Sequence, residues 1–230
     1  MQAAFSALGA HASLVRGGRG QTVSLAFDSS EAVFVVRSGT LTLHVTMPGT
    51  RRQVIALLFA GDVLRSSFAP PLSQATLTSV GASELWRLRW TAFEDLAAAD
   101  PALTRCVHDA LAAQMARYAI HVAAIGQFTG EQRVATVLVE LALRSGLGTS
   151  GGGIEMPLSR KDIADYLGLN ADTVSRIMSQ LRSAGILGRC DRNRAVIRDF
   201  GALAALSPAA RSLSEIHRDR RGEMLPSKRD

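Results

Sequence analysis

The sequence predicts an α+β protein that joins an N-terminal antiparallel β-roll, a long dimerisation helix and a C-terminal winged helix-turn-helix. Three observations predict this class. Short β-rich runs fill the first part of the chain, an apolar heptad pattern follows, and two capped amphipathic segments separated by a glycine lie near the end. We assign residues 1–100 to the β-roll, 101–127 to the dimerisation helix and 128–230 to the winged helix-turn-helix.

The β-roll is predicted by a succession of short strands over about residues 14–88. Turn dipeptides interrupt these strands at Ser38-Gly39, Pro48-Gly49 and Gly61-Asp62. Their spacing suits a small barrel or jelly roll. We expect an irregular segment at 66–73 and a short helix at about 91–100.

A long helix is predicted from Pro101, because proline suits the first helical turn. Five apolar residues then alternate at spacings of four and three, which forms a heptad seam that favours a partner helix. A single helix packed on its own roll shows a similar pattern. The seam residues are Leu111, Met115, Tyr118, Val122 and Ile125.

Gly126 and Gly130 flank a predicted hinge, which is followed by a helix over about 130–145 and a flexible glycine-rich connection at 146–153. Past this connection, Ser159 and Asp162 form a capping-box-like helix start. Gly168 stands where a sharp turn requires positive φ, and Asn170 suits the cap of the second helix.

The second helix of this motif has a predicted buried stripe and ends at Gly185. The stripe consists of Val174, Ile177, Met178 and Leu181. Two short β-like runs after Gly185 predict a wing with Arg192 and Arg194 at its tip. The polar tail from Leu213 onward is expected to be frayed.

The charge distribution favours DNA as the partner. The chain carries 26 Lys and Arg against 20 Asp and Glu, and residues 157–230 hold 14 basic and 9 acidic side chains, a net of +5. The positive excess therefore lies with the helix-turn-helix, as binding to phosphates requires.

No stretch reaches the roughly 20 apolar residues of a membrane span. The N-terminal residues lack a basic region followed by a continuous apolar run, so we expect no signal peptide and no membrane partner. Two cysteines do not make a disulfide framework. We expect a cytoplasmic protein.

The second helix of such a motif enters the major groove, where its outward residues near the N-terminus meet base edges. These residues are Asp172, Ser175 and Arg176. The predicted contacts to DNA phosphates, besides the two arginines of the wing, come from Arg160, Lys161, Thr173 and Arg182.

The run LSRKDIADYLGLNADTVSRIMSQLRSAGIL, together with GTLTL and GDVL in the roll, resembles the Crp/Fnr family of bacterial transcription regulators. The resemblance covers nearly the whole chain and implies a β-roll similar to cyclic-nucleotide-binding domains. It also implies a homodimer with recognition helices in successive major grooves of a near-palindromic site. Contact with RNA polymerase, as an activator or a repressor, is implied as well.

The residues 172–176, Asp-Thr-Val-Ser-Arg, resemble the Glu-Thr-Val-Ser-Arg run of the Fnr-like branch. By this resemblance, Arg176 reads guanine in a TTGA-like half-site and Ser175 lies near a thymine. Asp172 departs from the pattern by one methylene. A carboxylate at this position accepts a hydrogen bond from a cytosine amino group, directly or through water.

The sequence disfavours two of the ligands through which members of this family sense a signal, a cyclic nucleotide and an iron–sulfur cluster. Arg65-Ser66-Ser67 only partly matches the phosphate-binding run of a cyclic-nucleotide site and leads into a Pro-Pro break. An iron–sulfur cluster needs four cysteine ligands, and the chain has two. We therefore predict no cofactor. The family that the chain resembles also contains members controlled only by their own abundance, and this is an option here.

Two alternatives for the signal stay open. A haem-based sensor of nitric oxide or carbon monoxide would draw its ligands from the scattered histidines, Cys106 and Met115. Cys190 lies in a basic environment that favours thiolate, so oxidation there is a candidate redox brake on DNA binding, against an inert thiol. The candidate histidines are His11, His44, His108 and His121.

Functions other than DNA binding have weaker support in the sequence. A cupin-like metal enzyme needs clustered histidine and carboxylate ligands, and His44 stands alone in the predicted strands. No nucleophile elbow or phosphate loop is visible, so we predict no enzyme and no metal site. A ligand-binding or scaffold protein that has lost DNA binding is disfavoured by the basic C-terminal part and by Arg176.

Overall fold

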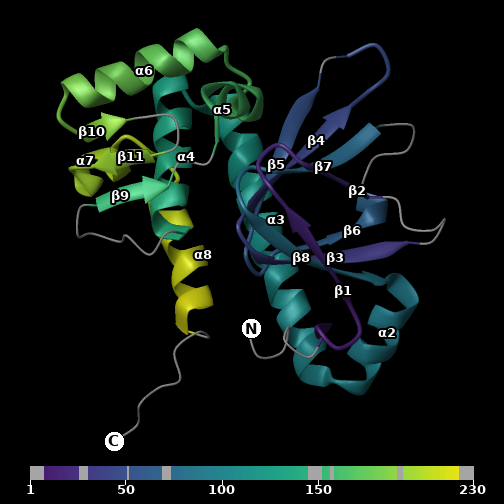
Figure 1. Cartoon of the computed structure of the whole chain (residues 1–230). Helices are drawn as coiled ribbons and strands as arrows, with labels where there is room; N and C mark the ends of the chain where they lie inside the picture. Colours follow the sequence, from purple (N-terminus) through teal and green to yellow (C-terminus); the bar gives the residue numbers. More distant parts are fainter. Residues whose placement is uncertain are drawn as a thin grey trace, which may run out of the picture. The chain divides into compact units, whose positions relative to one another are not determined.

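The computed structural model divides into two compact units, residues 1–115 and 116–230, which we describe separately (Figure 1). The boundary falls inside the long helix, so each unit contains part of it. The described residues are 8–25, 31–50, 52–68, 74–144, 152–155, 158–190 and 194–222. The predicted Pro-Pro break and the centre of the glycine-rich connection lie outside them.

The first unit contains two antiparallel sheets of four strands, in the orders β1-β8-β3-β6 and β2-β7-β4-β5. This confirms the predicted β-roll. The strands are β1 (Ser13–Gly17), β2 (Thr22–Ser24), β3 (Ala32–Ser38), β4 (Thr40–Thr46), β5 (Gln53–Phe59), β6 (Val63–Arg65), β7 (Gln74–Ser79) and β8 (Ser83–Arg89). A 3-10 turn, η1 (Ser66–Phe68), follows β6.

The turns of the roll lie where the sequence predicts them. Gly39 joins β3 to β4 with a φ of 84°. A Cβ atom at Gly39 would lie 2.4 Å from the Ala82 carbonyl oxygen, so no other residue fits there without a shift of the backbone. Gly49 and Gly61 also have positive φ.

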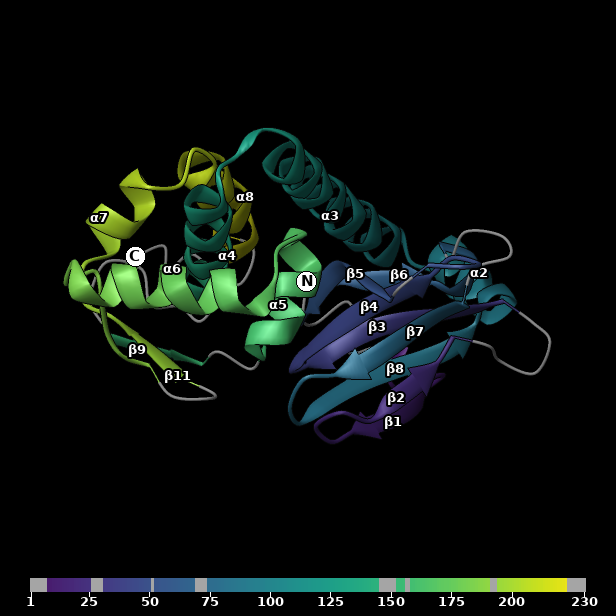
Figure 2. The same ribbon diagram turned by 90° about the horizontal axis from the view of Figure 1, so that it is seen from above.

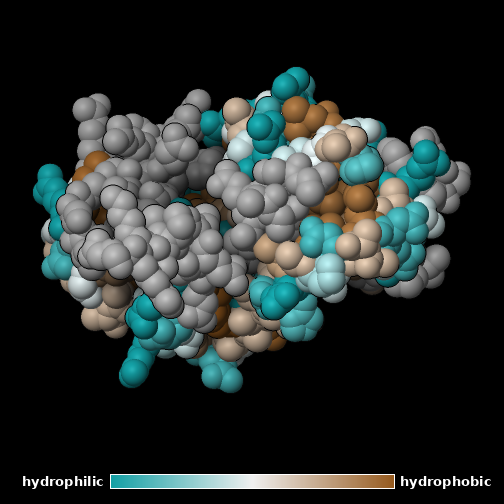
Figure 3. All heavy atoms as spheres, turned by 90° about the horizontal axis from the view of Figure 1, so that it is seen from below, coloured by the Kyte–Doolittle hydropathy of each residue, from teal (hydrophilic) through white to brown (hydrophobic). Residues whose placement is uncertain are grey.

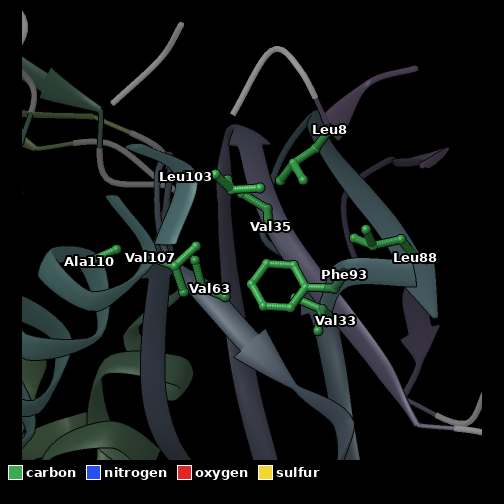
Figure 4. Close-up of a cluster of buried hydrophobic side chains, with 9 residues drawn as sticks. All are labelled: Leu8, Val33, Val35, Val63, Leu88, Phe93, Leu103, Val107 and Ala110. Carbon is green, nitrogen blue, oxygen red and sulfur yellow. The ribbon is translucent and has the colours of Figure 1, made fainter. Parts of the chain in front are cut away.

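Two helices pack on the sheet β1-β8-β3-β6. The short helix α2 (Trp90–Ala99) leads into α3 (Pro101–Gln127), which has the predicted bounds. Phe93 of α2 and Leu103 and Val107 of α3 pack on Val33 and Val35 of β3 (Figure 4). Further along α3, Gln114 is buried, and its Oε1 accepts a hydrogen bond from the Val63 N–H at 2.9 Å.

The second unit consists of the end of α3, a helical core and a small sheet with the order β10-β11-β9. Nine consecutive residues of α4, 134–142, are buried in the centre of the unit. The elements are α4 (Gly130–Arg144), β9 (Gly152–Glu155), α5 (Arg160–Leu167), α6 (Ala171–Ser183), β10 (Leu187–Cys190), β11 (Arg194–Ile197), α7 (Phe200–Ala205) and α8 (Ala210–Gly222).

Two predictions about this unit are wrong. The predicted flexible connection extends to Gly153, yet Gly152 and Gly153 belong to β9, because this strand pairs with β11. The tail is not frayed from Leu213 onward, because α8 continues to Gly222 and packs on α4. Leu213 and His217, one turn apart on α8, are buried.

Hydrophilic and hydrophobic residues are interspersed on the described part of the face drawn in Figure 3. Among the helices that the structure describes, none is long and apolar enough to cross a membrane.

Candidate nucleic-acid interface

The first helix of the predicted motif, α5, begins at a complete capping box. The Asp162 N–H donates to Ser159 Oγ at 3.1 Å, and the Ser159 N–H donates to Asp162 Oδ2 at 3.1 Å. This exchange satisfies two N–H groups at the helix end and fixes where the helix starts. Ile163, Ala164 and Leu167 are buried, as predicted.

The turn between the two helices has the predicted geometry. Gly168 ends α5 in the left-handed region, with φ 64° and ψ 35°. Asn170 then caps α6, because its Oδ1 accepts a hydrogen bond from the Thr173 N–H at 2.7 Å. One residue in the left-handed region and one cap therefore set the angle between α5 and α6.

The helix α6 ends in a Schellman motif at Gly185, whose φ is 75°. The Ile186 N–H donates to the Leu181 carbonyl oxygen and the Gly185 N–H to that of Arg182, both at 3.0 Å. Since both ends of α6 are capped, its length and its direction into β10 are fixed.

Burial along α6 separates a core face from an outward face. The predicted stripe of Val174, Ile177, Met178 and Leu181 is buried. The predicted base-reading residues Asp172, Ser175 and Arg176 are exposed on the N-terminal half of the helix. In the part of the chain that the structure describes, no acidic side chain forms an ion pair with Arg176.

Within the second unit, α6 lies across the end of α4, with α5 on one side and the small sheet on the other (Figures 1 and 2). Lys161 and Arg182 are exposed, whereas Arg160 and Thr173 are half-buried. Arg182 Nη2 donates to Ser179 Oγ at 3.4 Å. The predicted phosphate contacts therefore lie on α6, which also carries the predicted base-reading residues, and at the start of α5.

The wing is formed by β10 and β11, which pair antiparallel with Cys190 opposite Ala195. Arg192 lies outside the described residues, and of Arg194 only the backbone is described, opposite Glu155 of β9. The side chain of Cys190 also lies outside the described part, so its redox role stays a prediction.

The helix α3, which the sequence predicts to be a dimerisation helix, has two apolar faces. The first is buried against its own chain and includes Leu103, Val107, Ala110 and Ala124. The second is the predicted seam, which is exposed in the single chain except for the half-buried Tyr118. The exposed fractions of the other seam residues are 47% for Leu111, 67% for Met115, 69% for Val122 and 37% for Ile125.

A set of buried polar contacts, which the sequence analysis did not find, joins α3 to the helix-turn-helix inside the second unit. Arg117 Nε lies 3.2 Å from Glu140 Oε1, and both side chains are nearly inaccessible to solvent. The His121 ring stacks on the Tyr166 ring of α5, with 3.9 Å between centroids and 3° between planes. The sequence pattern that could have revealed the ion pair is a charged residue within an otherwise apolar stretch of each helix.

Two of the residues considered for a bound signal, His44 and Arg65, have protein contacts in the first unit. His44 is buried, and its Nε2 lies 2.6 Å from Thr42 Oγ1. Arg65 is exposed, pairs with Glu31 and stacks over the Trp90 ring at 3.7 Å. Over the described ranges of both units, no group of three or more His, Cys, Asp or Glu side chains is placed to hold a metal ion.

Comparison with known proteins agrees with this architecture. Residues 15–100 match the family of cyclic nucleotide-binding domains, and residues 132–206 match the Crp-like helix-turn-helix domain. The chain is 31% identical over 179 residues to the nitrogen fixation regulation protein FixK of Azorhizobium caulinodans, which covers 77% of this chain and 72% of FixK.

Two further proteins support the comparison. The transcriptional activator protein FnrL of Cereibacter sphaeroides is 28% identical over 192 residues, which covers 80% of this chain and 76% of FnrL. The solved structure of FixK2 from Bradyrhizobium japonicum is similar with a TM-score of 0.72 and 28% identity, over 86% of this chain and 98% of FixK2.

Proposed function

Because the chain belongs to the Crp/Fnr family of DNA-binding transcription regulators, we propose that it binds a near-palindromic, TTGA-like site as a homodimer and contacts RNA polymerase there. The observation that carries the proposal is the outward face of α6, where Asp172, Ser175 and Arg176 are exposed near the N-terminus of a helix capped at both ends. The N-terminal part of such a helix is the part that contacts base edges.

Each of the three base-reading residues is assigned to one base of the half-site. The guanidinium of Arg176 matches the two acceptors of guanine, and Ser175 lies one residue away, facing the neighbouring thymine. Asp172 lies one turn before Arg176 on the same face and accepts from a cytosine amino group. Because aspartate is shorter than the glutamate common in this family, preference at this base pair is expected to be weaker.

The exposed seam of α3 supports the homodimer. Met115 and Val122 are about two-thirds exposed in the single chain, which is unfavourable for large apolar side chains at regular heptad positions unless a second helix covers them. Two copies paired along this seam present two α6 helices. A site with two inverted half-sites has the matching symmetry.

We propose that DNA binding requires no bound cofactor, so that the amount of protein sets the response. The contacts of His44 with Thr42 and of His121 with Tyr166 favour this over haem ligation by either imidazole. The ion pair of Arg65 with Glu31 and its stacking over Trp90 likewise favour binding without a cofactor over binding of a cyclic nucleotide. Because its proposed partner is chromosomal DNA, the protein acts in the bacterial cytoplasm.

A salt titration tests the proposed function. The purified protein, without added ligand, is expected to bind a duplex with two inverted TTGA-like half-sites more tightly than a scrambled duplex. The affinity for both duplexes should fall steeply with salt, because bound cations leave the phosphates when the protein binds. Equal affinity for both duplexes, or an affinity independent of salt, would contradict the proposal.

A further inference from the structure

The contacts between α3 and the helix-turn-helix combine a buried ion pair with a ring stack and with hydrogen bonds from a half-buried arginine. We call the set of residues that makes them the polar joint; it consists of Arg117 and His121 of α3, Arg133 and Glu140 of α4, and Tyr166 of α5. All five belong to the second unit. Together they link three helices near the start of the helix-turn-helix.

The Arg117–Glu140 pair fixes α3 against α4. The exposed fractions of the two side chains are only 4% and 9%. A buried ion pair contributes little net stability, because desolvation offsets the Coulomb attraction. It does penalise every arrangement of the helices in which either charge loses its partner, so it selects one arrangement among several of similar stability.

The remaining contacts extend this arrangement to α5. The rings of His121 and Tyr166 are stacked almost parallel, and burial lowers the pKa of His121 to about 4, so the ring is neutral at neutral pH. Arg133 Nη1 donates to the Leu167 carbonyl oxygen at the end of α5 at 3.0 Å. Its Nε donates to the Phe128 carbonyl oxygen at 2.9 Å, in the connection between α3 and α4.

The same stretch of α3 carries the exposed seam. Tyr118 and Val122 follow Arg117 and His121 directly in the sequence, so the partner helix and the polar joint contact adjacent faces of α3. A rotation of α3 at the seam therefore changes the contacts of the joint. The joint in turn holds α5, whose angle to α6 is set by Gly168 and Asn170.

From this placement we propose that the polar joint positions the helix-turn-helix relative to the dimer seam, so that its residues set DNA affinity without touching DNA. This inference rests on the proposed function for its effect on DNA binding. It makes a separate claim about geometry, namely that the joint holds α3 and α6 in one arrangement.

The test replaces the ion pair by apolar side chains, Arg117→Met with Glu140→Met. Removal of one partner alone leaves a buried charge and endangers folding, whereas replacement of both is expected to keep or raise the melting temperature. In the double variant we expect an unchanged dimer and an affinity for the two-half-site duplex lower by at least about tenfold. The double variant Arg218→Gln with Glu215→Gln removes an exposed pair of the same unit and should change neither quantity.

A second readout measures geometry without DNA. Spin labels at Ala119→Cys on α3 and Gln180→Cys on α6, two exposed positions of the second unit, report the distance between these helices. Cys106 and Cys190 are replaced by serine, and the labelled protein is diluted with unlabelled protein so that only distances within one chain are measured. We expect a narrow distribution in the parent and a broader or shifted one in the apolar variant. An unchanged distribution overturns the proposal, and so does a broader one with unchanged DNA affinity.

The two readouts separate this inference from the proposed function. If the parent protein does not bind the operator duplex at all, the proposed function fails. The distance distributions then still decide whether the polar joint holds the helices in one arrangement.

Discussion

Acidic residues in the α3 seam are expected to abolish dimerisation and to lower operator affinity by more than about 100-fold, because the second half-site then no longer binds intramolecularly. The variant is Met115→Glu with Val122→Glu. Both side chains are exposed in the single chain, at 67% and 69%, so each chain should still fold. In a dimer, the carboxylates of the two chains face each other at positions 115 and 122 and repel. Each charge is also buried without a partner in an apolar contact, which is unfavourable.

The measurement is sedimentation equilibrium together with DNA binding to one and to two half-sites. Arg105→Glu provides the control, because Arg105 is exposed on the same helix but outside the seam. We expect this control to remain a dimer with nearly parental affinity. A seam variant that stays dimeric at micromolar concentration would show that a different surface pairs the two chains.

Replacement of Arg176 by alanine is expected to weaken binding to the preferred site by about 1–3 kcal/mol per half-site and to relax preference at one base pair. The reason is the loss of two hydrogen bonds to guanine from a side chain whose own helix stays capped and packed. Affinity is measured for the preferred duplex and for each single substitution at the guanine position.

Arg182→Ala is the matched comparison, since Arg182 is an exposed arginine of the same helix assigned to phosphate. Its loss should weaken binding to all sequences alike and reduce the salt slope by about 1 per half-site. If Arg176→Ala instead weakens every duplex equally, Arg176 contacts the backbone and the assignment to base reading is wrong.

The helix-turn-helix could be predicted from the sequence because its constraints are local. The capping box at Ser159 and Asp162, the positive φ of Gly168 and the stripe on α6 each depend on residues within two turns of one another. The bounds of α3 were likewise predictable, since Pro101 marks its first turn. The structure places the predicted base-reading residues on one exposed face, and their contacts with DNA stay predictions.

The parts that the sequence did not reveal depend on distant partners. Gly152 and Gly153 have no strand propensity, and they form β9 only because β11 offers a free edge. The charged helix α8 buries just one narrow stripe against α4, which polar composition hides. Arg117 and Glu140 lie 23 positions apart, and although each interrupts an apolar stretch, no local pattern shows that the two charges pair when α3 packs on α4.

The most direct test of the central claim is a selection of DNA bound by the parent protein from a pool of random duplexes. The account predicts enrichment of two inverted TTGA-like half-sites whose centres lie about one helical turn, roughly 10–10.5 base pairs, apart. The variable base should be the one that faces Asp172. Enrichment of a single half-site, of direct repeats or of no sequence at all would contradict a homodimer that reads DNA through α6.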